Sequence, residues 1–191
     1  MTTTQNQLNS VLTDLADLLE QIPSGAAGPT PCTDYDQATL RQHVIGWLTA
    51  FTEGFEDPEG NCGDPESVVV DGNGATQVRG LRDRLDAALS DGAGERPLSI
   101  GGAAMPGAMA LEMILWEYQM HGWDLARSAG LDWSPEVNGL EASLAFAPAM
   151  LTPDFQGVGK SFAPQVAVPA DAPALDRLAG LSGRDPRWSH A

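Results

Sequence analysis

The sequence has 191 residues, enough for one domain with a hydrophobic core and too few for two ordinary domains. Its 26 acidic and 10 basic residues give a formal charge of -16, which repels phosphate groups and argues against binding of nucleic acid or anionic lipid. The N-terminus lacks a basic segment followed by an apolar one, and no run of about 18 apolar residues occurs. A cytoplasmic protein without membrane insertion is therefore expected.

The chain carries two cysteines, Cys32 and Cys62, which are isolated in sequence and lack Cys-x-x-Cys spacing. Two isolated cysteines cannot build a disulfide framework, so both are expected to be free thiols. Either could ligate a metal or act as a nucleophile, but a structural role is favoured because no histidine is adjacent in sequence. The penultimate His190 is assigned no role.

Apolar residues at helical spacing predict a first helix over residues 8–22, which Pro23 and the glycines after it end. A second helix is expected from about Gln37 to Thr52, with His43 on or beside its apolar stripe. Residues 54–76 are rich in glycine and proline and predict a long connection. A connection of this length often lines a functional site.

The second half of the chain shows alternating helical and extended patterns. The expected elements, in order, are a helix over 78–89, a strand over 96–100, a long helix from Met105-Pro106 to Gly130, a weaker helix over 134–150, a strand over 161–168 and a helix over 173–181. These elements predict a mainly all-α fold, a helical bundle with long connections and minor β additions. We expect a single domain over 1–191, with the bundle over about 5–152 and a short C-terminal extension over about 153–191.

The long helix carries Glu117, His121 and Asp124 on one face, because positions four and seven residues apart point in similar directions. The same face carries apolar side chains, including Met113 and Trp116. Ionisable groups on a core-facing stripe need partners, since burial of an unpaired charge is costly. The spacing therefore marks these three residues as a candidate functional cluster.

A second histidine on an inner helix face, His43, makes a metal site conceivable. Two imidazoles and the Glu117 carboxylate would form an open site for a divalent ion, and bundle cores build such sites from facing helices. Asp124 would then orient a ligand histidine through a hydrogen bond, act as a fourth ligand, or pair with Arg127. The alternative is a helical domain without metal, whose inward polar groups are satisfied by hydrogen bonds.

Other candidates have simpler interpretations. Arg41 and Arg127 could bind a substrate carboxylate, although surface ion pairing is favoured. The glycine pairs lack the context of a nucleotide-binding loop. Three aromatic residues could wall a pocket but are expected in the core first: Trp47, Trp116 and Trp123.

A family resemblance extends over nearly the whole chain. It is carried by PTPCTDYD with His43 following, by EYQMHGWDLARSAG and by the tail LDRLAGLSGRDPRW. These segments resemble the metal-binding, N-terminal-type domain of mycothiol-dependent maleylpyruvate isomerase and its short single-domain relatives in the DinB-like superfamily. The resemblance implies a DinB-like four-helix bundle that holds a divalent metal, usually zinc, through His43, Glu117 and His121.

The chain departs from the isomerase at its C-terminus. In the isomerase a separate C-terminal domain contributes to the active site, whereas only the short extension over 153–191 is present here. Maleylpyruvate isomerisation is therefore not the expected reaction. Wider members of the superfamily include thiol transferases.

The resemblance implies a metal-dependent thiol transferase or isomerase, in which mycothiol or a similar low-molecular-weight thiol binds as a thiolate and adds to an electrophilic substrate. No residue stands out as a separate general base, so the catalytic residues stay unassigned. The competing hypothesis is a non-catalytic metal-binding or sensor protein with a structural ion. An open cavity beside the metal favours the enzyme, and a fourth protein ligand favours the competing hypothesis. A homodimer is compatible with both.

Overall fold

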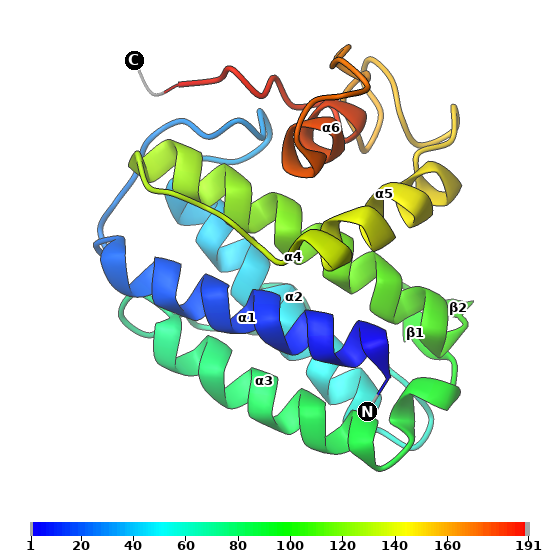
Figure 1. The fold of residues 1–191 in the computed structure, drawn as a ribbon. Helices are drawn as coiled ribbons and strands as arrows, with labels where there is room; N and C mark the ends of the chain where they lie inside the picture. Colours follow the sequence, from blue (N-terminus) through cyan, green and yellow to red (C-terminus); the bar gives the residue numbers. More distant parts are fainter. Residues whose placement is uncertain (1, 190–191) are drawn as a thin grey trace.

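Four long helices form the body of the computed structural model, which describes residues 2–189. They pack into a bundle in which α1 contacts α3 and α4, and α2 contacts the same two helices (Figure 1). The expected all-α class with minor β additions is confirmed. The bounds of the four helices are α1 Thr3–Gln21, α2 Gln37–Glu56, α3 Ala75–Ser90 and α4 Gly107–Ala129.

Shorter elements connect and cover this bundle. Two short strands follow α3 and pair antiparallel, with Leu98 opposite Met105 and Ile100 opposite Ala103. Helices α5 and α6 pack on each other, and α5 also packs on α4 and α1 (Figure 1). The bounds of these elements are η1 Pro65–Ser67, η2 Ala93–Glu95, β1 Leu98–Ile100, β2 Ala103–Met105, α5 Val137–Met150 and α6 Ala174–Leu181.

Local signals explain where the two helices of the candidate site begin and end. Helix α2 starts with a capping box, in which the Asp36 side chain accepts from the Thr39 amide at 2.8 Å and Thr39 Oγ1 accepts from the Asp36 amide at 3.0 Å. It ends at Glu56, one turn beyond the expected Thr52. Helix α4 ends at Ala129 and is capped by Gly130, whose φ of 67° is left-handed and favours glycine, as the sequence predicts.

One expectation about an extended segment is wrong. Residues 161–168 form no strand, since their backbone finds no neighbouring strand: the Val166 amide donates to the Gly180 carbonyl at the end of α6 instead.

The expected long connection after α2 is confirmed, with only the short η1 between Glu56 and Ala75. It packs against α2, where Pro65 lies so close to Gly46 that a Cβ atom would clash. It contributes no residue to the cavity described below.

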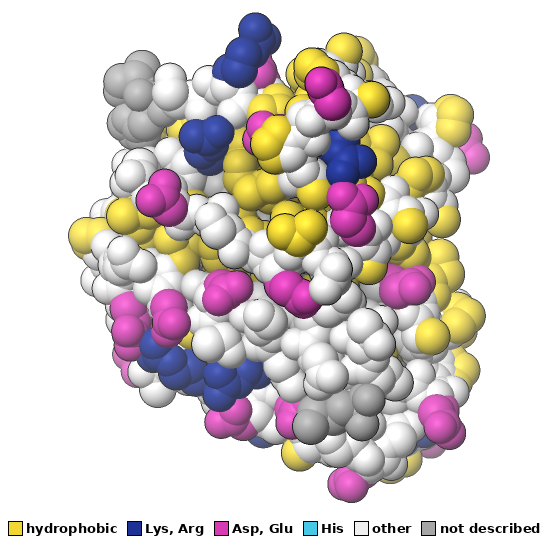
Figure 2. All heavy atoms as spheres, in the orientation of Figure 1, with side chains coloured by type: hydrophobic (Ala, Val, Ile, Leu, Met, Phe, Trp, Pro, Cys, Tyr) yellow, Lys and Arg dark blue, Asp and Glu magenta, His cyan; other side chains and the backbone are white. Residues whose placement is uncertain are grey.

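The core is continuous across α1 to α6 and contains most of α4. Trp116 and Trp123 are 1% and 2% exposed, so the expectation that they belong to the core is confirmed. Figure 2 shows acidic side chains scattered over the face of the molecule that it draws, in agreement with the net charge of -16. Within residues 2–189, no helix combines the length and the apolar character needed to cross a membrane.

Gly122, next to His121, allows α4 to approach the loop before α5. A Cβ atom at this position would overlap the indole ring of Trp133, whose Nε1 donates to the Gln119 carbonyl at 2.9 Å. We expect Gly122→Ala to lower the free energy of unfolding by about 1–3 kcal/mol, as overpacking in a filled core does. Urea unfolding followed by circular dichroism measures this change.

A matched control for Gly122→Ala is available on α3. A Cβ atom on Gly80 would meet no heavy atom within 4 Å. Gly80→Ala is expected to raise the free energy of unfolding by up to about 1 kcal/mol, because alanine is the better helix former. Equal changes in the free energy of unfolding for the two substitutions would show that overlap with Trp133 is not the reason why position 122 requires glycine.

Candidate functional site

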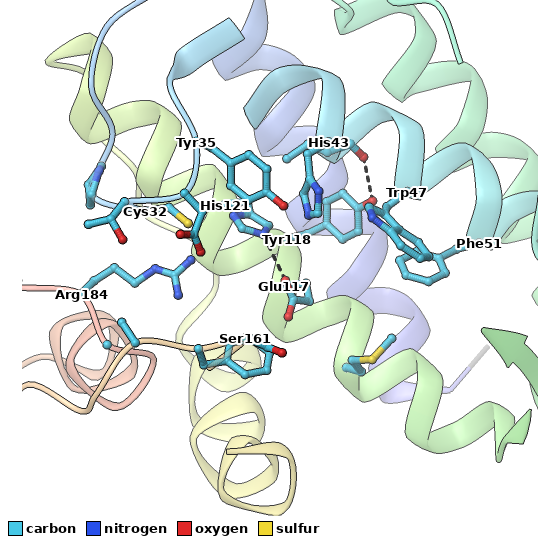
Figure 3. Close-up of a pocket in the computed structure, with 18 of the residues that line it drawn as sticks. Cys32, Tyr35, His43, Trp47, Phe51, Glu117, Tyr118, His121, Ser161 and Arg184 are labelled. Carbon is cyan, nitrogen blue, oxygen red and sulfur yellow. Dashed lines mark hydrogen bonds and ion pairs between the residues drawn. The ribbon is translucent and has the colours of Figure 1, made fainter. Parts of the chain in front are cut away.

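A cavity of about 340 Å³ lies between α2, α4, the segment before α2 and the C-terminal extension. Figure 3 shows side chains from these four parts of the chain converging on it. Three of its lining residues, His43, Glu117 and His121, are those that the sequence marks as metal ligands. The structure therefore brings the predicted site residues together, although His43 and Glu117 are 74 positions apart in the sequence.

His121 sits between two carboxylates on its own helix. Its Nε2 lies 3.1 Å from Glu117 Oε2, and its Nδ1 lies 3.2 Å from Asp124 Oδ2. Burial alone would lower the pKa of His121, but the two carboxylates raise it to about 8. Burial would also raise the pKa of Glu117, yet the hydrogen bond and the charge of His121 hold it below its usual value.

Asp124 is held from its other side by Arg184, a residue of the C-terminal extension. Arg184 Nη2 donates to Asp124 Oδ2 at 2.9 Å, and Arg184 Nη1 donates to the Ser182 carbonyl at 2.8 Å. Asp124 is fully buried, but the positive charge of Arg184 and the hydrogen bond from His121 keep its pKa below the usual value. The Ser182 hydroxyl accepts from Trp116 Nε1 at 2.9 Å. A chain of polar contacts thus runs from the core to the cavity.

His43 faces His121 across the α2–α4 interface. The centres of their rings are 5.2 Å apart, and the planes are nearly perpendicular. Tyr118 Oη donates to the Val44 carbonyl at 2.9 Å and ties the two helices together beside the site. Burial and the charge of His121 lower the pKa of His43 to about 4, so this imidazole is neutral at neutral pH.

Two further side chains border the histidines. Tyr35 stacks on His43 with ring centres 4.6 Å apart, and Figure 3 shows its hydroxyl pointing toward the space between the two histidines. Cys32 also lines the cavity, and both cysteines are free thiols, as expected. Burial raises the pKa of Cys32 to about 11, although the charge of Arg184 opposes the shift. A thiol this weakly acidic is a poor nucleophile at neutral pH.

The donor set fits a divalent ion in its chemistry: two imidazoles and one carboxylate face one cavity, and a buried carboxylate supports one imidazole. Among the described residues, however, no three His, Cys, Asp or Glu side chains are arranged so that they could hold an ion without moving. Instead, Glu117 Oε2 and His121 Nε2 form an ion pair with each other. Both would have to turn toward the ion, and His121 would have to release its proton.

Other sequence candidates lie elsewhere. Arg41 is 4% exposed and donates to the Pro23 and Ser24 carbonyls, so the expected surface pairing is wrong, and it does not line the cavity. Arg127 donates to the Pro186 carbonyl and lies over the Trp123 ring, so its suggested pairing with Asp124 is also wrong. His190 lies outside the described residues.

Among the cavity residues that sequence reasoning missed, Tyr35 and Arg184 contact the candidate site: Tyr35 stacks on His43, and Arg184 bonds Asp124. Tyr35 lies two residues before the start of α2, where a tyrosine has no helical periodicity to indicate its direction. Arg184 belongs to the tail motif GRDPRW, but nothing in the spacing relates it to a helix face 60 residues earlier. Only the packing of the C-terminal extension on α4 brings Arg184 to Asp124.

Comparisons with known proteins place the chain beside two relatives. No family model and no solved structure matches it. It is 30% identical over 162 residues to the uncharacterized proteins MT0763 and Rv0738 of Mycobacterium tuberculosis strains CDC 1551 / Oshkosh and ATCC 25618 / H37Rv. The match covers 84% of this chain and 85% of each relative. At this identity and coverage, the chain belongs to the same family as these two mycobacterial proteins.

Proposed function

We propose that the protein binds a divalent metal, zinc first, and acts as a thiol-dependent transferase or isomerase of the mycothiol type. The observation that carries this proposal is His121, which sits between Glu117 at the cavity and the buried Asp124 behind it. A buried carboxylate behind a histidine is the usual way in which proteins orient a metal ligand. The resemblance of EYQMHGWDLARSAG to the maleylpyruvate isomerase family supports the same assignment.

His43, Glu117 and His121 would hold the ion, and Asp124 would fix the ring of His121 through Nδ1. When bound, a divalent ion lowers the pKa of a thiol and so supplies a thiolate at neutral pH. His43 is already neutral, which suits a ligand, and one part of the cavity wall is apolar.

The cavity supports a catalytic role over a purely structural ion. A structural site is closed by a fourth protein ligand. Asp124, the candidate for that fourth ligand, does not line the cavity and accepts a hydrogen bond from Arg184 instead. Beside the two histidines, about 340 Å³ is open to a ligand. This space falls within the usual range for small-molecule sites.

The test is metal analysis of protein purified without a metal-affinity tag, followed by substitution with cobalt. We expect about one zinc ion per chain. Mycothiol at millimolar concentration is expected to change the visible absorption of the cobalt form, because a thiolate ligand alters the electronic spectrum. Absence of zinc after exposure to a small excess would contradict the metal assignment, and an unchanged cobalt spectrum would contradict the thiol assignment.

A further inference from the structure

The cavity has two chemically different ends. Figure 3 shows Cys32 and Arg184 at one end and Trp47 and Phe51 at the other, with the two histidines and Glu117 between them. The direction follows from the helices: His43 faces His121, and Val44 contacts Tyr118, so α2 and α4 run in opposite directions here. Trp47 and Phe51 therefore lie one and two turns along α2 toward the N-terminal half of α4.

The end lined by Trp47, Phe51, Ile100 and Met113 is called the aromatic end. Ring centres of Trp47 and Phe51 are 5.2 Å apart with planes tilted by 32°. Met113 precedes Glu117 by one turn of α4 and, like Trp47, is half-buried at the cavity. Aromatic rings and a methionine thioether bind a flat aromatic group well, since both favour ring contacts.

The aromatic end offers no positive charge to a ligand. Arg184 is the only lysine or arginine among the described lining residues, and it lies at the opposite end. Its guanidinium already donates to Asp124 and to the Ser182 carbonyl. A carboxylate placed among Trp47, Phe51 and Met113 would lose its hydration without gaining a partner, which is costly.

We infer that the aromatic end binds the ring of an aryl-substituted electrophile, so the substrate class is aromatic and not a small dicarboxylate. This inference rests on the proposed function, in which the neighbouring His43, Glu117 and His121 hold the metal that binds the thiolate. The substrate would lie along the cavity, with its reactive carbon beside the histidines and its ring between Trp47 and Met113. The same charge argument separates this protein from an enzyme that acts on a dicarboxylate such as maleylpyruvate.

The test compares trans-cinnamate with fumarate by isothermal titration calorimetry. Both acids carry a carboxylate on one carbon of a trans double bond; the other carbon carries a phenyl group in trans-cinnamate and a second carboxylate in fumarate. We expect trans-cinnamate to bind at least about tenfold more tightly, because only the phenyl group gains from burial. Equal affinities, or tighter binding of fumarate, would overturn the inference.

Variants assign the preference to the aromatic end. Trp47→Leu is expected to reduce the preference to less than about threefold, because it removes the ring contact and keeps an apolar side chain. Met113→Glu, at a half-buried position, is expected to weaken trans-cinnamate binding at least about tenfold by placing a charge against the ring. Phe155→Leu is the matched control, since Phe155 is 54% exposed and lies outside the cavity. An effect of Phe155→Leu as large as that of Trp47→Leu would overturn the assignment.

Both titrations are run on zinc-loaded protein and on protein treated with a chelator. A cinnamate preference that depends on Trp47 supports the inference with or without zinc. If it occurs in protein that takes up no zinc, the aromatic end is supported and the proposed function fails. Zinc uptake with equal affinities for the two acids has the opposite meaning: the inference fails and the proposed function stands.

Discussion

Arg184→Ala is expected to lower the free energy of unfolding by about 3–5 kcal/mol, the usual cost of breaking a buried ion pair. Asp124 is fully buried, and Arg184 is 8% exposed, so the substitution removes the positive partner of a buried carboxylate. The Asp124 carboxylate would keep only its hydrogen bond to His121. The C-terminal extension would also lose the bond that Arg184 makes to the Ser182 carbonyl. Urea unfolding followed by circular dichroism measures the loss.

Arg187 provides the matched control, since it lies three residues later in the same segment. Its guanidinium is exposed and, within residues 2–189, pairs only with Asp185, so Arg187→Ala is expected to leave the unfolding midpoint unchanged. Arg184→Met combined with Asp124→Asn removes both buried charges and should cost much less than the sum of the two single substitutions. A loss below about 1 kcal/mol for Arg184→Ala, or strict additivity, would contradict this account of the pair.

Helical periodicity is what made most of the fold predictable. The apolar stripe of α1 and the cap signals of α2 and α4 are local, so the sequence contains them in full. The strand over 161–168 was mispredicted because strands depend on a partner elsewhere in the chain. There the Val166 amide finds the end of α6, and only the isolated bridge between Gln156 and Phe162 forms.

The same distinction applies to the candidate site. Glu117, His121 and Asp124 share a face of one helix, so spacing alone relates them. The approach of His43 to His121 depends on how α2 packs on α4, which the apolar stripes indicate only in outline. Arg184 could not be predicted at all, because its position depends on a segment with little regular structure.

Arg41 shows how a charge on a helix can mislead. An arginine near the start of α2 is expected at the surface, where most arginines lie. Instead, the segment after α1 folds over it, and its guanidinium donates to the carbonyls of Pro23 and Ser24. Those carbonyls follow the last turn of α1 and need donors, and Arg41 supplies them. The burial of Arg41 is therefore structural.

The second large effect concerns the metal. We expect His121→Ala to weaken zinc binding by more than about a hundredfold, because loss of a group that only supports a ligand already costs about 10–100-fold. Asp124→Asn, which changes that supporting group, should fall within this smaller range. Competition with a chelating indicator measures both affinities, on protein purified without a metal-affinity tag.

The contrast between these variants and two controls decides whether His121 is a ligand. Cys62→Ala should bind zinc like the unmodified protein, because Cys62 lies outside the cavity. Cys32→Ser should also do so, because Cys32 lines the cavity but does not belong to the proposed ligand set of His43, Glu117 and His121. Undiminished zinc binding by a folded His121→Ala variant would rule out the assignment. Zinc loss in Cys32→Ser as large as that in His121→Ala would instead make the thiol a ligand, leaving one coordination position fewer for a thiol substrate.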